Sequence, residues 1–317
     1  MRAAVIGAGA WGTAFSTILT ARGHDVTLVC RDPEQAREIE ATGRNPRYLP
    51  GADLSGVSAT TPGDPSLAEV DLQVIAVPSR AFREVADALP ADAPVLSLTK
   101  GLDPATGRRL SQLVGGRAVA VLSGPNFAEE IAAGLPAAAV LASDNEPLLL
   151  ELQEAIHSLA FRVYVSGDVT GVELCAAAKN VVALAAGGVD GLELGDNAKA
   201  ALIARGLAEM ARLGEACGAR PETFSGLAGM GDLIATCWHH DGRNRRAGEL
   251  IARGASPDEA AAEIGTVEGL TTAPILRDLS HRVGIELPIT EGVCRVLDGD
   301  DLGALAAGLM GRQPTRE

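Results

Sequence analysis

Long apolar runs are missing from the 317-residue sequence, in which no stretch of about 18 or more consecutive apolar residues occurs. We therefore expect no membrane-spanning helix. The N-terminus also lacks the basic region, apolar run and cleavage site of a secretory signal, which predicts a cytoplasmic protein. Cysteine is scarce, and its scattered spacing is typical of buried thiols in a reducing compartment; the five are Cys30, Cys175, Cys217, Cys237 and Cys294.

Basic residues are also few. The sequence has 27 basic and 41 acidic side chains, which gives a net charge of −14. This charge repels nucleic acids and anionic membranes, so neither is expected as a partner. An anionic substrate would need a local basic cluster. No Walker sequence and no Ser/His/Asp arrangement is evident. Cys237, His239 and His240 do not predict a metal site, because adjacent histidines rarely reach one ion with good geometry.

Aromatic residues make up only 3% of the chain, so alanine, leucine and valine must build the core. Hydrophobic residues account for 47% and charged residues for 21%, which is typical of a globular protein. The length predicts two domains.

Up to about residue 165, short apolar segments alternate with amphipathic ones. This alternation predicts an α/β fold, a doubly wound and mostly parallel sheet. The expected strands are 2–6, 26–30, 71–77, 94–98, 118–122, 137–142 and 161–165. The expected helical stretches between them are 33–41, 79–89, 107–114, 126–133 and 146–157. Residues 43–66, rich in proline and glycine, are expected to be irregular.

Beyond residue 167 the sequence becomes rich in alanine, and Pro147 is the one proline between residues 137 and 220. Long helices are expected over 169–186 and 197–217, separated by a loop at 187–195. Helical patterns continue to the C-terminus, interrupted at 226–231, 241–244 and Pro288. We therefore predict a Rossmann domain, 1–167, and an all-helical domain, 168–317, with the active site between them.

The first strand runs directly into a Gly-x-Gly-x-x-Gly sequence. Gly7 permits a tight turn, Gly9 lets backbone N–H groups approach a pyrophosphate, and Gly12 packs the next helix against the strand. That helix, about 11–22, directs its positive N-terminal end at the phosphates. A glycine-rich turn in another α/β protein is the alternative, but the position at the start of a β–α–β pattern predicts dinucleotide binding.

The end of the second strand bears on which dinucleotide binds. An acidic residue about 20 positions after the glycines usually binds the adenosine ribose of NAD. Here Arg31 comes first, and its permanent planar charge suits the 2′-phosphate of NADP. Asp32 follows and keeps NAD open, and Arg31 stacking on the adenine remains an alternative.

Three charged residues are candidates for catalysis. Lys100 follows the fourth strand, at the sheet edge where ligands bind, although a solvated loop lysine would look the same. Lys179 lies in an alanine-rich helix, where burial would lower its pKa and allow proton exchange; a lysine reaching out from a helix edge is the alternative. Asp232 follows a glycine-rich stretch, where it either caps a helix or orients Lys179.

Two further segments are candidate anion sites. Gly124 and Pro125 end a strand and open onto a helix, offering backbone N–H groups, although a simple turn before a helix has the same pattern. The cluster Gly242-Arg243-Asn244-Arg245-Arg246 is densely basic. A solvated basic surface is the alternative, but in so acidic a chain a dense basic cluster favours a phosphate-binding site.

Taken in order, these segments resemble the NAD(P)-dependent glycerol-3-phosphate dehydrogenase family, bacterial type, over essentially the whole chain. The matching segments are Gly7-Ala8-Gly9-Ala10-Trp11-Gly12, Lys100-Gly101, Ser123-Gly124-Pro125, Lys179-Asn180-Val181, Gly229-Met230-Gly231-Asp232-Leu233, Gly242-Arg243-Asn244 and Glu268-Gly269. The resemblance implies interconversion of dihydroxyacetone phosphate and sn-glycerol 3-phosphate with NAD(P)H, supplying glycerophospholipid synthesis, without a metal.

The resemblance also implies roles for individual residues. Lys179 would exchange the proton, Lys100 would contact substrate oxygens, and Asp232 would orient Lys179. The implied substrate-binding residues are Lys100, Gly124, Asn126, Lys179, Asp232, Gly242, Arg243 and Asn244. The implied cofactor-binding residues are Gly7, Gly9, Ala10, Trp11, Gly12, Arg31, Lys100, Ala128, Arg243 and Glu268.

Asn126 and Gly242 depart from the family pattern, which usually has serine or threonine at the first position and serine at the second. Altered affinity or a shifted substrate is therefore open. The alternatives are a related two-domain dehydrogenase for another phosphorylated or hydroxy-acid substrate, and a non-catalytic NADP-binding sensor. Base rates favour an isologous homodimer.

Overall fold

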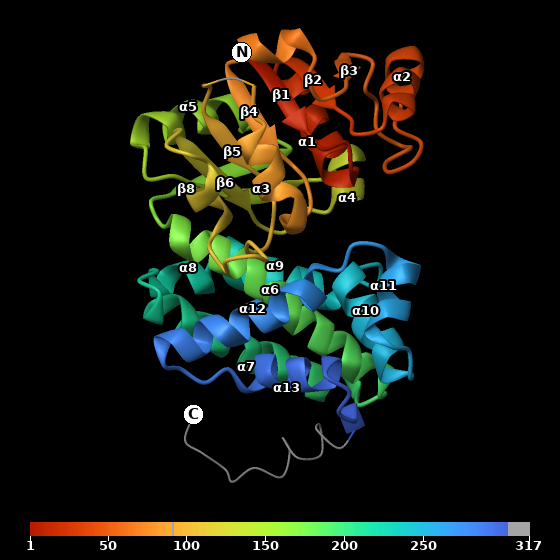
Figure 1. Ribbon diagram of the computed structural model, residues 1–317, viewed down its shortest axis with the longest axis vertical. Helices are drawn as coiled ribbons and strands as arrows, with labels where there is room; N and C mark the ends of the chain where they lie inside the picture. The colour runs from red at the N-terminus through yellow and green to blue at the C-terminus, as the bar shows by residue number, and fades with distance from the viewer. Residues whose placement is uncertain (91, 304–317) are drawn as a thin grey trace.

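The computed structural model, which describes residues 1–90 and 92–303, has a sheet half and a helical half (Figure 1). One eight-stranded sheet has the strand order β3-β2-β1-β4-β5-β6-β7-β8. Every neighbouring pair is parallel except β6 and β7. The strands are β1 (Arg2–Ile6), β2 (Asp25–Val29), β3 (Val57–Thr60), β4 (Leu72–Ile75), β5 (Val95–Ser97), β6 (Val119–Ser123), β7 (Ala137–Ala142) and β8 (Phe161–Ser166).

Helices connect the strands by crossovers and cover the sheet. They are α1 (Ala10–Ala21), α2 (Pro33–Thr42), α3 (Ser79–Asp87), α4 (Ala128–Ala132) and α5 (Glu146–Ile156). Apolar side chains of the strands, such as Val5, Leu28 and Val74, are fully buried beneath these helices. The predicted doubly wound, mostly parallel sheet is thereby confirmed.

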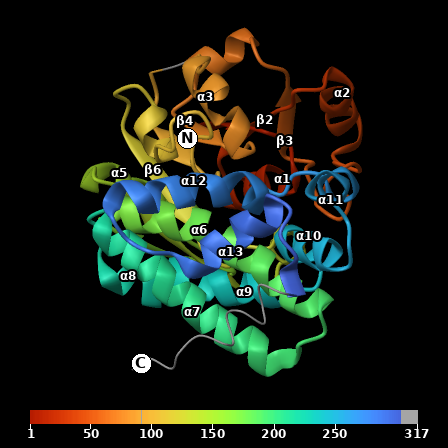
Figure 2. The same cartoon turned by 60° about the horizontal axis from the view of Figure 1, so that its bottom comes forward.

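The helical half surrounds one long helix, α6 (Val169–Gly191), which packs against α7, α9, α10 and α12 (Figure 2). By length and hydropathy α6 is apolar enough to cross a membrane, but 89% of its apolar window is buried inside the protein, as in a core helix. The other helices are α7 (Gly195–Ala216), α8 (Pro221–Ser225), α9 (Asp232–Trp238), α10 (Arg243–Ala252), α11 (Pro257–Ile264), α12 (Glu268–Val283) and α13 (Pro288–Leu297).

Three local predictions were wrong. The segment 43–66, expected to be irregular, contains β3, an edge strand whose Val-Ser-Ala-Thr sequence is only four residues long and has one large apolar side chain. Residues 107–114, expected to be helical, contain only a short 3₁₀ turn at Leu110–Leu113. The loop expected at 187–195 is confined to 192–194, because α6 continues through Gly187 and Gly191.

Those glycines stay helical because α10 lies against them. A Cβ on Gly187 would overlap the backbone carbonyl of Arg245, and one on Gly191 would crowd the carbonyl of Glu249. The two helices therefore touch backbone to backbone, and tertiary packing overrides the low helix propensity of glycine. The end of the predicted helical domain, 304–317, lies outside the described residues.

Candidate active site

The glycine turn after β1 has the geometry that a dinucleotide phosphate needs. Gly7 has φ +114°, a conformation that L side chains rarely adopt, and a Cβ on Gly12 would overlap the Gly7 carbonyl oxygen. A Cβ on Gly9 would meet nothing within 4 Å. Because Gly9 has no capping side chain, the first N–H groups of α1 are left for an anion. The turn fits a pyrophosphate.

Three other expected cofactor positions lie beside this turn. Ala10 is the first residue of α1. Trp11 packs edge-on against Phe15, and its indole Nε1 is buried without a hydrogen-bond partner among the described residues. Ala128 begins α4 and shares a small apolar cluster with Ala14 and Trp11. An orphaned indole N–H beside the glycine turn is a group that a ligand can satisfy.

After β2, the side chain of Arg31 is available to a ligand, whereas the carboxylate of Asp32 is engaged by other residues. Arg31 is exposed and has no hydrogen-bond or ion-pair partner within the described ranges. The Asp32 carboxylate caps α2 by accepting the Glu34 N–H at 2.9 Å, and it pairs with Arg47 at 3.3 Å. Burial raises the pKa of the neighbouring Cys30 thiol to about 11, so it stays protonated. The unpaired cation and the engaged carboxylate suit an additional phosphate.

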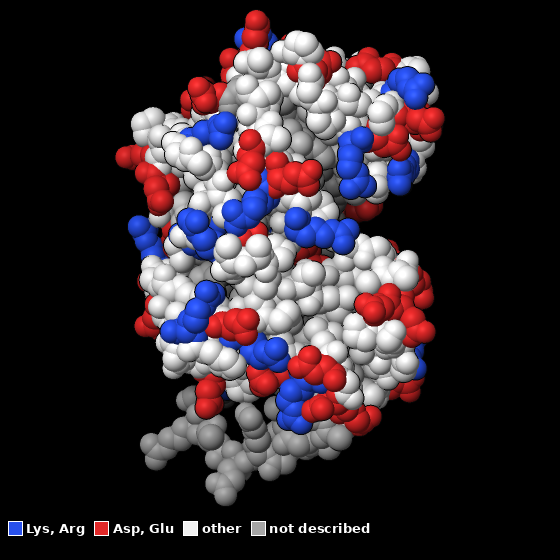
Figure 3. Space-filling model, viewed as in Figure 1, with Lys and Arg blue, Asp and Glu red and all other residues white. Residues whose placement is uncertain are grey.

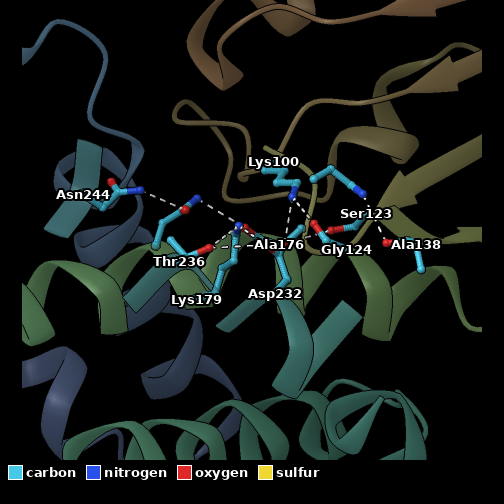
Figure 4. Close-up of polar contacts among 11 residues, drawn as sticks. Lys100, Ser123, Gly124, Ala138, Ala176, Lys179, Asp232, Thr236 and Asn244 are labelled. Atoms are coloured by element: carbon cyan, nitrogen blue, oxygen red, sulfur yellow. Dashed lines mark hydrogen bonds and ion pairs between the residues drawn. The ribbon is translucent and has the colours of Figure 1, made fainter. Parts of the chain in front are cut away.

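A single carboxylate lies between two lysines where the two halves meet (Figure 4). Lys100, just after β5, donates to Asp232 Oδ2 at 2.7 Å and to the Gly124 carbonyl at 2.8 Å. Lys179, in the middle of α6, donates to Asp232 Oδ1 at 2.5 Å. The sequence reasoning anticipated the contact between Asp232 and Lys179, but not that Lys100 binds the same carboxylate.

Burial and charge shift the protonation of this group. Burial lowers the pKa of Lys179 to about 7, and the Lys100 charge adds to that effect, while Asp232 opposes it. For Asp232, burial favours the neutral acid, but the charges of Lys100 and Lys179 outweigh it and hold the pKa below its usual range. The pair therefore combines a fixed anion with a lysine that can exchange a proton near neutrality.

Three further residues support this centre and were missed as individual candidates. Thr236 accepts a 2.8 Å hydrogen bond from Lys179. Its i, i+4 spacing from Asp232 places both on one face of α9, a signal that the sequence does carry. Ser123, at the end of β6, lies 3.4 Å from Asp232 Oδ2. Asn180 follows Lys179 and accepts a hydrogen bond from Asn244 at 3.0 Å.

The two departures from the family pattern leave different groups available. Asn126 donates to the Ala138 carbonyl at 3.2 Å, while its Oδ1 is buried without a partner among the described residues. Gly242 already donates its N–H to the His239 carbonyl, and its own carbonyl accepts from Arg246. The side-chain oxygen of Asn126 therefore remains as an acceptor, whereas the Gly242 N–H is engaged.

The basic segment at the start of α10 divides into paired and unpaired side chains. Arg243 is exposed and has neither a hydrogen-bond nor an ion-pair partner in the described part of the chain. Asn244 is buried, donates to Asn180 and accepts the Gly269 N–H at 2.8 Å. Asn244 thus ties α10 to α6 and α12. In Figure 3, Lys and Arg side chains gather along the boundary between the halves, which is notched on one side.

Both halves of the chain match models of one protein family. The family model for the NAD-dependent glycerol-3-phosphate dehydrogenase N-terminus matches residues 2–149, and the model for its C-terminus matches residues 168–302. The chain belongs to the NAD-dependent glycerol-3-phosphate dehydrogenase family. The relationship expected from the sequence segments is confirmed.

Individual members of the glycerol-3-phosphate dehydrogenase family are similar over nearly their full length. Glycerol-3-phosphate dehydrogenase [NAD(P)+] of Halorhodospira halophila is 46% identical, with 99% of this chain and 98% of that protein covered. The protein of the same name from Streptomyces coelicolor is 45% identical, with 94% of this chain and 92% of that protein covered. The crystal structure of the Coxiella burnetii enzyme matches with a TM-score of 0.92 and 39% identity, covering 98% and 99%.

More distant structures share the fold alone. A ketopantoate reductase family protein from Ralstonia eutropha matches with a TM-score of 0.59 at 19% identity. A D-mandelate dehydrogenase with NADH matches with a TM-score of 0.63 at 12% identity. These matches support the two-part architecture and say nothing about the substrate.

In this family member, Glu268 is engaged with the sheet half. Its carboxylate accepts the Ser79 N–H at 3.0 Å and the Ser79 hydroxyl at 2.5 Å, which caps α3. A Cβ on Gly101, next to Lys100, would lie 3.2 Å from the same carboxylate. Glu268 thus lies beside the loop that carries Lys100, although it is more than 160 residues away in sequence.

Among the described residues, one group of possible metal ligands lies in the turn between α9 and α10. Ligand atoms of His239, His240 and Asp241 lie within 4.8 Å of one another. His240 and Asp241 are exposed and already pair at 2.9 Å. Cys237, grouped with these histidines on sequence alone, is fully buried, and burial raises the pKa of its thiol to about 12. Asp241 adds a carboxylate beside the two histidines.

Proposed function

We propose that the chain interconverts dihydroxyacetone phosphate and sn-glycerol 3-phosphate, using NAD(P)H and NAD(P)⁺. The observation that carries the proposal is Asp232 held between Lys100 and Lys179, followed on α10 by Arg243, which has no partner in the described part of the chain. A carbonyl reduction needs a proton donor, and a phosphorylated substrate needs a free cation. Lys179 lies at the junction of the two halves, and Arg243 precedes Asn244, which binds Asn180 beside Lys179.

In the proposed mechanism Lys179 donates its proton to the oxygen of the substrate carbonyl, and accepts it again in the reverse reaction. Asp232 and Thr236 hold the Lys179 ammonium in place. Lys100 stabilises the developing negative charge on oxygen together with Lys179. When bound, the nicotinamide of the cofactor supplies or accepts the hydride.

The proposed substrate contacts use the groups that remain free. Arg243 binds the phosphate, and the Oδ1 of Asn126, which has no partner within residues 1–90 and 92–303, accepts a hydrogen bond from a substrate hydroxyl. Gly124 lies beside the site through its carbonyl, which binds Lys100. Asn244 contributes by fixing the N-terminus of α10.

For the cofactor we propose NADP in preference to NAD. Gly7, Gly9 and Gly12 form the pyrophosphate turn, and Arg31 has no competing partner among the residues that the structure describes. Asp32, the residue that would serve the ribose of NAD, is engaged by the N-terminus of α2 and by Arg47. Glu268 is proposed to contact the cofactor next to Ser79.

We further propose a division at residues 167 and 168, where β8 has ended and α6 begins. We also propose that the protein is cytoplasmic, that it supplies glycerol 3-phosphate for glycerophospholipid synthesis, and that it forms an isologous homodimer.

The experiment that tests the function is the loss of absorbance at about 340 nm when dihydroxyacetone phosphate is added to NADPH or to NADH. Rapid oxidation supports the reaction, and a higher kcat/KM with NADPH supports the role of Arg31. No oxidation with either cofactor would reject the function and direct attention to other phosphorylated carbonyls, because Asn126 and Gly242 depart from the family pattern.

The two directions of the reaction are expected to depend oppositely on pH near neutrality. Reduction needs protonated Lys179, so kcat/KM for dihydroxyacetone phosphate should fall as the pH rises above about 7. Oxidation needs the neutral amine, so kcat/KM for glycerol 3-phosphate should rise up to about pH 7 and then level off. Initial rates between about pH 5.5 and 9.5 measure both profiles, and kcat/KM reports groups of the free enzyme. Parallel profiles in both directions would contradict the assignment.

Replacing Arg243 by alanine is expected to raise the KM for dihydroxyacetone phosphate about 10- to 100-fold, the loss of one charge-assisted contact. The KM for NADPH should rise much less. Steady-state kinetics measure both, and Arg246→Ala is the matched control, because Arg246 lies on the same helix and is already near Glu263 at 3.8 Å. Equal effects of the two variants would place the phosphate elsewhere.

A further inference from the structure

The turn at residues 239–242 joins α9 to α10 and leads directly into Arg243. Its shape depends on one acceptor, the His239 carbonyl oxygen. The Gly242 N–H donates to this oxygen at 3.0 Å, and Arg245 Nε donates to it at 3.3 Å. Arg245 therefore holds, by its side chain, the turn that precedes its own helix.

Arg245 is itself fixed by a largely buried ion cluster. Its NH1 group donates to Asp190 of α6 at 2.8 Å and to Glu249 of α10 at 3.1 Å. Lys199 of α7 binds the same Asp190 oxygen at 2.8 Å. Side-chain exposure is 13% for Arg245 and 7% for Lys199, so solvent screens these contacts weakly. The cluster links three helices behind the turn.

Close packing fixes α10 on α6 as well. A Cβ on Gly248 would overlap the Leu184 carbonyl, just as one on Gly187 would overlap that of Arg245. The side chain of Asn244 binds Asn180, the neighbour of Lys179. In both Figure 1 and Figure 2, α10 lies beside α6. The helix that begins with Arg243 is thus built against the helix that carries Lys179.

On its other side the turn touches the sheet half. The His239 ring stacks on Phe127 with centroids 4.1 Å apart and an interplanar angle of 27°. Phe127 directly follows Asn126, one of the proposed substrate-binding residues. A side-chain hydrogen bond from Arg245 to the His239 carbonyl and a ring contact from Phe127 therefore hold the turn from two directions.

We propose that Arg245, anchored by Asp190, is a positioning residue for the substrate phosphate. The Arg243 guanidinium has no partner of its own among residues 1–90 and 92–303, so its direction depends on the backbone from which it projects. Arg245 sets that backbone through the His239 carbonyl. This inference rests on the proposed function, in which Arg243 binds phosphate.

The test compares two substrates in Arg245→Met, a variant that keeps most of the aliphatic stem. The KM for dihydroxyacetone phosphate is expected to rise at least about tenfold, because a small misplacement of a binding group is costly. The kcat should change less than about threefold, and kcat/KM for dihydroxyacetone, which lacks the phosphate, should stay within about twofold. A residue needed only for folding would reduce the rates with both substrates alike.

Two more variants complete the design. Arg245→Lys retains a cation for Asp190 but has no Nε–H for the His239 carbonyl, so its KM should also rise; it decides the matter if Arg245→Met fails to fold. Arg253→Met is the matched control, because Arg253 pairs with Glu249 at 2.7 Å but does not reach the turn, and its KM should be unchanged. A wild-type KM in Arg245→Lys, or equal losses with both substrates, would overturn the inference. If the wild-type protein does not reduce dihydroxyacetone phosphate at all, the proposed function itself fails.

Discussion

Lys179→Ala is expected to lower kcat for dihydroxyacetone phosphate reduction by about 10³-fold or more, while the affinity for NADPH stays within about threefold. General acid catalysis contributes about 10²- to 10⁴-fold, and in the proposed mechanism Lys179 also stabilises the developing charge on oxygen. Both contributions belong to the transition state, so their loss reduces kcat rather than cofactor binding. Steady-state rates and a fluorescence titration with NADPH measure the two quantities.

Two variants separate chemistry from packing. Lys179→Met keeps much of the buried stem, so a similar loss of kcat would assign the effect to the ammonium group. Val182→Ala changes a residue one turn further along α6 that packs toward Gly206 and has no polar group for Asp232. It should reduce stability but leave kcat nearly unchanged. Near-wild-type turnover in Lys179→Ala would remove Lys179 from the mechanism.

Features that depend on adjacent residues were predictable from the sequence. The glycine turn is local, since Gly7 and Gly12 form it with the neighbouring strand and helix. The seven strands other than β3 were found for a similar reason, because each is a short segment rich in apolar residues. The edge strand β3 was missed, because an edge position needs few apolar residues.

Contacts between distant residues were predictable only in part. Lys100 and Asp232 are 132 positions apart, and no local pattern indicates that they meet. Family resemblance suggested that Asp232 orients Lys179, but not that Asp232 also binds Lys100. Asn244 was expected on the phosphate, whereas its side chain binds Asn180 and Gly269. The direction of a side chain depends on helix packing, which a motif does not contain.

The scarcity of lysine is a compositional signal for the active site. Only three of the 27 basic residues are lysines, and they are Lys100, Lys179 and Lys199. All three have side chains that are less than 20% exposed. A chain that uses arginine for nearly all its surface cations retains lysine where a compact ammonium, able to lose its proton, is useful. The two lysines at the junction of the halves fit that pattern.

Asp232→Asn is expected to reduce both turnover and stability. The carboxylate is 3% exposed and is the only anion bonded to the ammonium groups of Lys100 and Lys179 in the described part of the chain. Removing one partner from such a buried group costs about 3–5 kcal/mol of unfolding free energy. Turnover should fall about 10²- to 10³-fold, because Lys179 is no longer oriented and is less often protonated at neutral pH.

The pH dependence of this loss identifies its electrostatic origin. Without Asp232, less opposes the burial that lowers the pKa of Lys179, so that pKa falls further below the wild-type value of about 7. At a pH between the lowered Lys179 pKa of the variant and the wild-type value, Lys179 is neutral in the folded variant but protonated in its unfolded chain. The free energy of unfolding of the variant therefore rises with pH in this range. The folded wild-type protein retains that proton in this range.

The stability deficit of Asp232→Asn should therefore be largest near pH 5, shrink as the pH rises toward about 7, and stay constant above that pH. Urea unfolding at several pH values measures it. Asp298→Asn is the matched control, because this pair with Arg277 is 68% exposed on the aspartate side and contributes about 1 kcal/mol or less. A deficit that does not change with pH would mean that Asp232 stabilises the site by shape and hydrogen bonding, and not by compensating the charge of Lys179.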